Sequence, residues 1–478
     1  MNKYLTYEAF GAKGDGKTND FPAIVACHDE ANKLGLPVKA NDDATYYIGG
    51  NALTAIIKTD VDFGKAKFII DDTAVEDRRL NIFCLKSDHE AFTPEISPLK
   101  KGQKHTDNPY GEKLFVRVFN SKEKIFIRKG LNMNNGTDTT DCFILDKNGD
   151  ILSSIEWNYP EITSAYARRV DDLPISITGG IFTTVANQDE SFYNYYGRGF
   201  RIERSNVSIS SVTHYVKGEG DQGAPYGSFL HIDTAYNVSV SDCLLTPHFI
   251  YYTPSQVPGQ LVPMGSYDIN VNASIKISFL GIKQTVDICD KRYWGLYGSN
   301  FTKEISLENC IMSRYDAHQG VSGVNIKNCV FGHQGVNLIG YGEAVIENTE
   351  IFGGSFINLR SDYGSVWFGN ITIKNCSLHP THEGYRLITT YNPGDHDFGY
   401  NTKMADKIVI DGFTIFDDAY SVEPYVFTNY DSEANTEHPF PYTLPECIVI
   451  KNVKTSSGKV IKIASNEALF SGLNIIKD

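Results

Sequence analysis

The stretch that decides the fold is Ile305-Ser-Leu-Glu-Asn-Cys310, because its pattern returns as Val324-Asn-Ile-Lys-Asn-Cys329 and as Ile371-Thr-Ile-Lys-Asn-Cys376. The pattern is apolar-x-apolar-x-x-apolar, and cysteine is accepted at the last position. Further copies begin at residues 207, 238, 275, 344, 408 and 448. Alternation of apolar and polar residues is typical of short strands with one face turned inward.

The spacing of the copies distinguishes between β architectures. Successive copies begin 19 to 40 residues apart, and the shortest intervals fit one coil of a solenoid. A propeller needs regular blades of about 40 residues, and intervals of 19 and 20 residues are too short for such blades. A β-sandwich would need loops of irregular length between the copies. We therefore predict an all-β protein, a right-handed parallel β-helix. Asparagines at the fifth position should bond along the stack at a bend, and the cysteines should be buried thiols and not a disulfide framework.

Two segments depart from the repeat. Residues 20–34 have helical character, with Asn19 or Asp20 as a candidate N-cap and Gly35 as a stop, and should cover the open end of the solenoid. Residues 86–170 lack the pattern and contain hairpin-like strands near 114–119, 124–128 and 142–145. The predicted domains are residues 1–85 as the cap and first coils, 86–170 as an inserted antiparallel β subdomain, and 171–478 as the β-helix with the active site.

Composition narrows the class of partner. The net charge of −14 argues against nucleic acid, and no apolar run reaches the roughly 20 residues that span a membrane. No Cys/His spacing fits a structural zinc site. No signal-peptide core is visible, so we expect a cytoplasmic or virion-associated protein, or a secreted one whose leader was removed.

The glycine-rich start supports a family resemblance. Residues 11–18 satisfy the phosphate-loop pattern GxxxxGK[ST], but the alternating strands and helices of an NTPase do not follow. Residues 7–20, with a helix after them, instead resemble the opening of pectate-lyase-superfamily β-helices. That group includes polygalacturonase-like hydrolases and phage tail-spike depolymerases, and the resemblance implies a glycan substrate.

Polar and aromatic residues crowd the gaps between repeats from residue 267 to 363. Each group follows a strand at a similar offset, so stacking should bring the groups onto one side of the helix. The candidates are Asp287, Asp290, Arg292, Trp294, Arg314, Tyr315, Asp316, His318, His333, Arg360 and Asp362.

The resemblance to polygalacturonase-like hydrolases implies roles for some of them. Asp316 would be the general acid, Asp287 or Asp290 the base that activates water, His333 an orienting group, and Arg360 a sugar ligand. The remaining candidates, Asp362, Arg314, His318, Trp294, Tyr315 and Arg292, are predicted to bind substrate. Two carboxyl groups suit an inverting glycoside hydrolase, and crowding by other carboxylates should raise the pKa of Asp316.

Departures from the family leave alternatives open. Only one aspartate stands at 315–316, and Asp362 replaces a family lysine that binds uronate, which favours a neutral or amino sugar. The first hypothesis is a glycoside hydrolase without cofactor. The second is a polysaccharide lyase, with Arg314 or Arg360 near the abstracted proton and Ca²⁺ held by aspartates. The third is a non-catalytic phage tail or adhesin protein that binds glycan, for which we expect a homo-oligomer, and a trimer if it is phage-derived.

Overall fold

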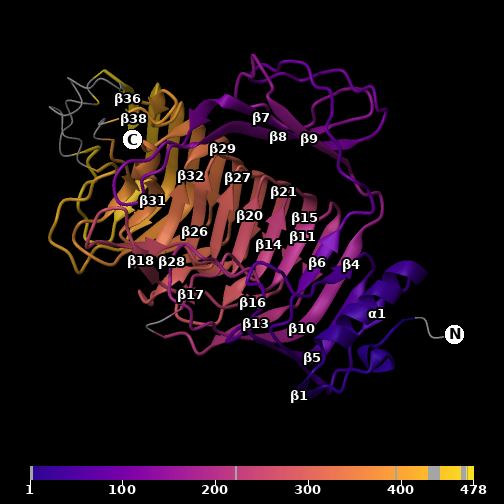
Figure 1. The fold of residues 1–478 in the computed structure, drawn as a ribbon. Helices are drawn as coiled ribbons and strands as arrows, with labels where there is room; N and C mark the ends of the chain where they lie inside the picture. The colour runs from indigo at the N-terminus through magenta and orange to yellow at the C-terminus, as the bar shows by residue number, and fades with distance from the viewer. Residues whose placement is uncertain are drawn as a thin grey trace.

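The chain forms a parallel β-helix. The computed structural model describes residues 4–220, 223–392, 396–428, 442–464, 470 and 472–477. Its principal sheet has 29 strands, and all their pairings are parallel. Figure 1 shows the strands stacked in chain order from α1 (Phe21–Leu34) at one end toward the C-terminus at the other. The fold predicted from the repeat is therefore confirmed.

Three faces run along the helix, which we call A, B and C in the order in which each coil visits them. Face A contains β2 (Val38–Lys39), β12 (Val207–Ser210), β15 (Tyr236–Ser241), β21 (Ile275–Leu280), β25 (Lys303–Glu308), β27 (Val321–Lys327), β29 (Gly340–Glu347) and β38 (Asn474–Lys477). Face B contains β1 (Asp15–Asn19), β3 (Thr45–Ile48), β13 (Thr213–Lys217), β16 (Leu244–Leu245), β22 (Lys283–Gln284) and β30 (Glu350–Gly353). Face C contains β4 (Ala55–Ile57), β6 (Phe83–Lys86), β11 (Phe200–Glu203), β14 (Leu230–Asp233), β20 (Ile269–Asn272), β24 (Tyr297–Asn300), β31 (Ser355–Leu359) and β33 (Arg386–Thr389).

Some strands continue around a corner. Those that join faces A and B are β5 (Val61–Asp71), β10 (Ile175–Val185), β32 (Trp367–Pro380), β35 (Lys407–Ile415) and β37 (Cys447–Thr455). Those that join faces B and C are β26 (Ile311–Gln319) and β28 (Val330–Leu338). Shorter elements outside the principal sheet are η1 (Tyr7–Phe10), β17 (His248–Phe249), β18 (Tyr251–Pro254), β19 (Leu261–Met264), β23 (Tyr293–Gly295), η2 (Ser361–Tyr363), β34 (Thr402–Lys403) and β36 (Tyr442–Thr443).

The repeat occupies face A and the corner after it. Ile305 pairs with Val324, and Val324 pairs with Ala344, so first positions of the pattern stack on one another. One predicted copy was misaligned, because Val238 pairs with Ile277 and not with Ile275. The equivalent stretch there is Ile277-Ser-Phe-Leu-Gly-Ile282, which fits the pattern equally well.

The fifth position turns the corner between faces A and B. Its residues have positive φ in coil after coil: Ser211, Asp242, Gly281, Asn309, Asn328, Asn348, Asn375, Gly412 and Asn452. Asparagine and glycine tolerate this left-handed conformation best, which explains their recurrence. The predicted bond along the stack forms where the Asn348 side-chain amide donates to Asn328 Oδ1 over 3.1 Å. All nine cysteines are free thiols and seven are buried, as predicted.

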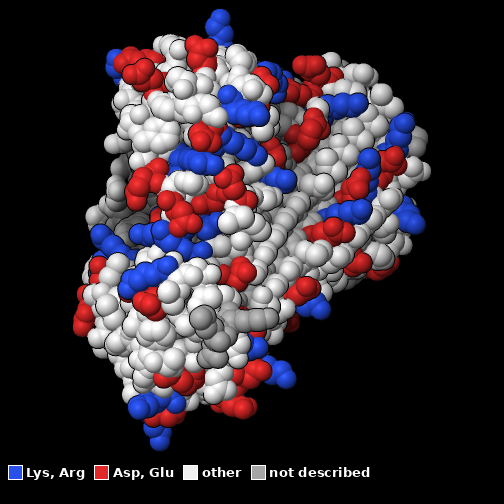
Figure 2. Space-filling model, turned by 90° about the vertical axis from the view of Figure 1, so that its right-hand side faces the viewer, with Lys and Arg blue, Asp and Glu red and all other residues white. Residues whose placement is uncertain are grey.

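Alternating charges stabilise the edge of face A. Glu308, Lys327, Glu347, Lys374, Asp411 and Lys451 pair in this order across neighbouring strands. Opposite charges on adjacent strands each contribute about 0.2 to 1 kcal/mol. Figure 2 shows the same interspersion of acidic and basic side chains over one side of the molecule, in place of a single-sign patch.

The N-terminal segment caps the stack as predicted. Gly35 ends α1 in the left-handed conformation. At its start Asn19 Oδ1 accepts a hydrogen bond from the Phe21 amide, whereas the Asp20 carboxylate accepts from the amides of Lys13 and Gly14. That carboxylate occupies the amides of the glycine-rich loop, where a phosphate loop would present them to an anion.

The predicted insert is a separate three-stranded antiparallel sheet of β7 (Leu114–Ile125), β8 (Thr137–Leu145) and β9 (Ser164–Arg169). Figure 1 shows it lying against the long side of the β-helix. A buried ion pair docks it there: Lys303 of β25 contacts Asp141 of β8, with 4% and 2% of their side chains exposed. Ser322 donates to Glu156 over 2.5 Å beside this pair. Among the described residues, no helix is long and apolar enough to cross a membrane.

Candidate functional site

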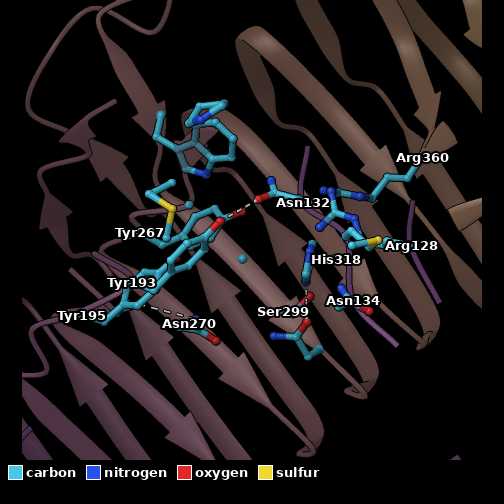
Figure 3. A pocket seen from close by; sticks show the side chains of 18 of the residues that line it. Arg128, Asn132, Asn134, Tyr193, Tyr195, Tyr267, Asn270, Ser299, His318 and Arg360 are labelled. Atoms are coloured by element: carbon cyan, nitrogen blue, oxygen red, sulfur yellow. Dashed lines mark hydrogen bonds between the residues drawn. The ribbon is translucent and has the colours of Figure 1, made fainter. Parts of the chain in front are cut away.

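A cavity of about 670 Å³ opens over face C, and we call it the site cavity. Its floor is formed by Asn270, Gly298, Ser299, Asn300 and His318, which come from three consecutive coils. One wall is built by loops that join faces B and C, and the other by Arg360 and the loop between β7 and β8 of the insert. In Figure 3, tyrosines of the first wall lie opposite Arg128 and Arg360, with His318 between them.

Asp316 lies directly beneath this cavity and is fully buried. Arg360 Nη1 donates to its Oδ1 over 2.5 Å, and Arg314 Nη2 lies 2.8 Å from its Oδ2. The Tyr267 hydroxyl donates to the same Oδ2 over 2.5 Å. The Asp316 carboxylate is thus held by two cations and a phenol.

The electrostatics of Asp316 contradict the sequence-based expectation. Burial by itself would raise the pKa of Asp316, but the guanidinium groups of Arg314 and Arg360 outweigh it and hold the pKa well below its usual value. We expected neighbouring carboxylates to raise this pKa, and that was wrong, because the neighbours are arginines. A carboxylate that stays ionised cannot serve as a general acid near neutral pH.

Two glycines make this arrangement possible. A Cβ on Gly298 would lie 2.8 Å from the Tyr267 ring, so the glycine lets Tyr267 reach Asp316 across the neighbouring coil. A Cβ on Gly295 would lie 2.6 Å from the Arg314 side chain, whose guanidinium stacks 4.5 Å from the Trp294 ring. Burial, and next the charge of Asp316, raise the pKa of Tyr267, so its hydroxyl stays protonated.

His318 is neutral in this environment. Its Nδ1 lies 2.9 Å from Asn300 Oδ1, and an amide oxygen can only accept, so Nδ1 carries the proton and Nε2 the lone pair. The hydroxyl of Tyr363 lies 3.4 Å from Nε2. Burial, followed by the nearby Arg360 cation, lowers the pKa of His318 to about 3.

The insert completes the cationic wall. Arg128 Nη2 lies 2.7 Å from Asp362 Oδ2, and Arg360 Nη2 donates to the same oxygen over 2.8 Å. Two guanidinium groups therefore share one carboxylate, whose pKa they lower against the effect of burial. From the same insert loop, Asn132 accepts a hydrogen bond from the Tyr193 hydroxyl over 3.3 Å, which links the insert to the opposite wall.

The remaining predicted catalytic residues form a different cluster. Asp290 binds Arg292 through both carboxylate oxygens, at 3.0 and 3.1 Å from Nε, and this lowers its pKa to about 2. Asp287 is exposed and accepts from the Cys289 amide, which closes a turn. His333 donates through its backbone amide and Nδ1 to Ile288 O, at 3.2 and 3.1 Å. None of Asp287, Asp290, Arg292 and His333 is among the described residues that line the site cavity.

His333 and Gly332 therefore position the loop that contains Ile288, and neither lines the site cavity. A Cβ on Gly332 would lie 1.8 Å from Ile288 O, so glycine is required for the loop to approach this coil. Tyr315 is likewise not a surface residue, because it is fully buried and stacks on Tyr297 at 4.9 Å in the core. Its predicted part in substrate binding is therefore wrong, whereas Trp294 does line the cavity.

Sequence reasoning missed several cavity residues. Arg128, Asn132 and Asn134 come from the insert, where no repeat pattern marks a site. Tyr193 and Tyr195 lie in a loop between faces B and C that precedes the predicted stretch by some distance. Within the described chain, no group of three or more His, Cys, Asp or Glu could hold a metal ion. Two aspartates of the predicted stretch, Asp316 and Asp362, bind arginines.

Comparison with known proteins supports the fold. No protein-family model matches the sequence, and no curated protein is recognisably similar to it. Among solved structures, the tailspike protein gp49 from Pseudomonas phage LKA1 has a TM-score of 0.57 at 13% identity, over 96% of this chain and 82% of that one. The gp54 tailspike of Acinetobacter baumannii bacteriophage AP22, solved with a capsular saccharide, has a TM-score of 0.55 at 10% identity, over 99% and 79%.

A family 28 exopolygalacturonase from Yersinia enterocolitica is also similar, with a TM-score of 0.46 at 10% identity, over 99% of this chain and 78% of that one. At these identities the likeness to the two tailspikes establishes the parallel β-helix alone. The chemistry of this chain has to be argued from its own side chains.

Proposed function

We propose that this protein binds an acidic polysaccharide in the site cavity and cleaves it by β-elimination. One observation carries the proposal: the ionisable side chains among the described lining residues are arginines, a histidine and tyrosines, and none is Asp or Glu. Glycoside hydrolysis needs two carboxyl groups beside the scissile bond. Elimination from a uronate needs a cation for the carboxylate, a base and a proton donor, and the cavity offers all three.

Arg128 and Arg360 are suited to the sugar carboxylate. They lie together at one end of the cavity and share the carboxylate of Asp362. Together with Arg314 they face only the two carboxylates of Asp316 and Asp362, so one positive charge is left for an anionic ligand. Guanidinium groups bind carboxylates in a planar, two-point geometry. The same charge would stabilise the anion that develops when the carbon next to the sugar carboxylate loses its proton. The sequence favoured a neutral sugar, because Asp362 stands where polygalacturonase-like hydrolases have a lysine that binds uronate. The two arginines favour an acidic sugar instead.

His318 and Tyr267 are suited to the proton transfers. His318 Nε2 takes the proton from C5, and that C–H electron pair forms the C4=C5 double bond. The C4–O bond breaks with its electron pair on the leaving oxygen, which receives the Tyr267 proton after that hydroxyl has turned from Asp316 to the substrate. No water is consumed, and both side chains recover their protonation by exchange with solvent. Tyr267 is protonated and His318 is neutral beforehand, as this direction of transfer requires.

Substrate would itself strengthen the base. The Arg360 cation contributes to the low pKa of His318, and a carboxylate bound at Arg360 offsets that cation. The pKa of His318 then rises toward the range in which a general base is effective. The saccharide bound by the AP22 tailspike further supports a glycan as the ligand of this fold.

A panel of acidic and neutral polysaccharides tests the proposal. Elimination creates a carbon–carbon double bond that absorbs ultraviolet light, so absorbance should rise with acidic polymers only. His318→Gln should lower the rate about a hundredfold or more, whereas His105→Gln, an exposed histidine on the insert, should not change it. New reducing ends without absorbance would identify a hydrolase instead. Binding without any product would leave a glycan-binding protein, and either result would refute the lyase.

A further inference from the structure

A second cavity of about 910 Å³ lies beside the β18–β19 hairpin, and we call it the hairpin cavity. It is lined by the hairpin, by Gln188, Glu190 and Ser191, and by Phe249, Lys291 and Arg292. Its size falls within the usual range of ligand cavities. The chemistry proposed above does not involve it.

The outer face of the hairpin borders both cavities. Tyr252 pairs with Pro263, and Pro254 pairs with Leu261, so these four side chains lie on one face. Tyr252 and Leu261 are 54% and 59% exposed, which is high for apolar side chains of this size. Tyr252, Pro254 and Leu261 line the hairpin cavity, whereas Pro263 lines the site cavity. A continuous apolar strip therefore connects the two.

A neighbouring loop makes the same connection. Glu190 and Ser191 line the hairpin cavity, and Tyr193 and Tyr195 line the site cavity a few residues later. The hydroxyl of Thr253 donates to Ser191 O over 2.6 Å, which ties the loop to the hairpin. The hairpin and this loop, which both border the two cavities, are therefore fixed to each other.

The far end of the strip carries aromatic rings and positive charge. Phe249 and Tyr293 pack at 4.8 Å, and the Arg292 guanidinium lies 5.8 Å from each ring. The Arg292 side chain is 71% exposed, and its double contact with Asp290 fixes its orientation. Lys291 is exposed beside it. Flat rings bind the apolar faces of sugars, and cations bind their acidic groups.

We infer that the hairpin cavity binds further units of the same acidic polysaccharide, so that the chain runs from the site cavity over Tyr252 and Leu261 to Phe249 and Arg292. This inference rests on the proposed function and specifies its substrate as a polymer held at several successive units. It also gives a function to Arg292 and Asp290, which lie outside the site cavity.

Binding measured against chain length tests the inference. Uronate oligosaccharides of increasing length are titrated into the protein in a calorimeter, and affinity should rise until both cavities are filled. In Tyr252→Ala and in Arg292→Ala, affinity for long oligosaccharides should fall about three- to tenfold, whereas the shortest ones should bind unchanged. Tyr4→Ala, an exposed tyrosine at the capped end, and Arg169→Ala, an exposed arginine of the insert, are the matched controls.

The outcomes separate this inference from the proposed function. Length-dependent binding that the two variants abolish, without unsaturated product, would support the second site and refute the lyase. Unsaturated product with affinity that is independent of length, or variants that match their controls, would overturn the second site and leave the lyase standing.

Discussion

Replacing Lys303 by methionine removes the ammonium group that neutralises Asp141 where the insert meets the β-helix. Methionine keeps most of the length of the side chain, so the change removes charge rather than volume. Because Asp141 is 2% exposed, its carboxylate is left as a buried charge without a cation. Removing one partner of a buried pair costs about 3 to 5 kcal/mol. Unfolding entropy of about 2.1 cal/mol/K per residue, over 478 residues, converts this to a Tm lower by about 3 to 5 °C.

The double variant Lys303→Met, Asp141→Asn should recover most of this loss. The asparagine leaves no charge behind and keeps an acceptor for the Glu156 amide, which donates to Asp141 Oδ2 over 2.7 Å. The exposed pair Lys122–Glu161 on the insert is the control, and Lys122→Met should cost less than about 1 kcal/mol. Urea unfolding followed by tryptophan fluorescence measures all of these, since Trp157 packs 5.4 Å from Tyr341 between insert and helix.

The loss of stability in Lys303→Met should also depend on pH in a defined direction. Burial raises the pKa of Asp141, and Lys303 partly offsets the rise. A raised pKa in the folded state means that stability is lost as the pH rises above the unfolded value of about 3.9. The deficit of Lys303→Met should therefore be small in acid and grow toward neutral pH. A deficit that is equal at both, or a double variant no more stable than the single one, would refute the buried-charge argument.

Three further predictions concern the site. The acidic limb of the kcat/KM profile should lie well below the usual histidine pKa of about 6.5, because burial and Arg360 hold His318 near 3, and Arg360→Gln should move that limb to higher pH. Asp316→Asn should lower the free energy of unfolding by about 3 to 5 kcal/mol in urea titrations, because it leaves the buried Arg314 without its counter-ion and Arg360 with Asp362 alone, and an unchanged midpoint would contradict this. Tyr315→Phe should retain full turnover in the absorbance assay, because its ring packs on Tyr297 inside the core.

Much of the fold was predictable because the repeat is a local pattern. Alternation within six residues indicates the strands, the face of each strand that points inward, and the buried cysteines, and its recurrence gives the spacing of the coils. The helix at 20–34 follows from the residues at its two ends. The copy at 275 was misaligned because Ile275, Ile277 and Phe279 all occupy alternate positions. The pattern therefore fits whether it begins at Ile275 or at Ile277. Only the contacts of the next coil distinguish them.

The site was harder to predict because it depends on distant contacts. Stacking correctly brought Arg314, Asp316 and Arg360 together, but the pKa of Asp316 depends on which partners reach it. Arg360 approaches from a later coil, and Arg128 from an insert that the repeat does not describe. The Asp287 and Asp290 loop was placed in the site by analogy of position, whereas Gly332 and His333 of β28 hold that loop against a later coil.

The corner between faces A and B contrasts with the corner between faces B and C. One left-handed residue turns it in every coil of the series from Ser211 to Asn452, so its length is constant. The corner between faces B and C instead carries loops of very different length, including the β18–β19 hairpin and the segment with β23. Substrate preference can therefore change as loops at the corner between faces B and C lengthen or shorten. The corner between faces A and B meanwhile keeps the coils in register. Such a division makes the scaffold a favourable starting point for grafting new specificities.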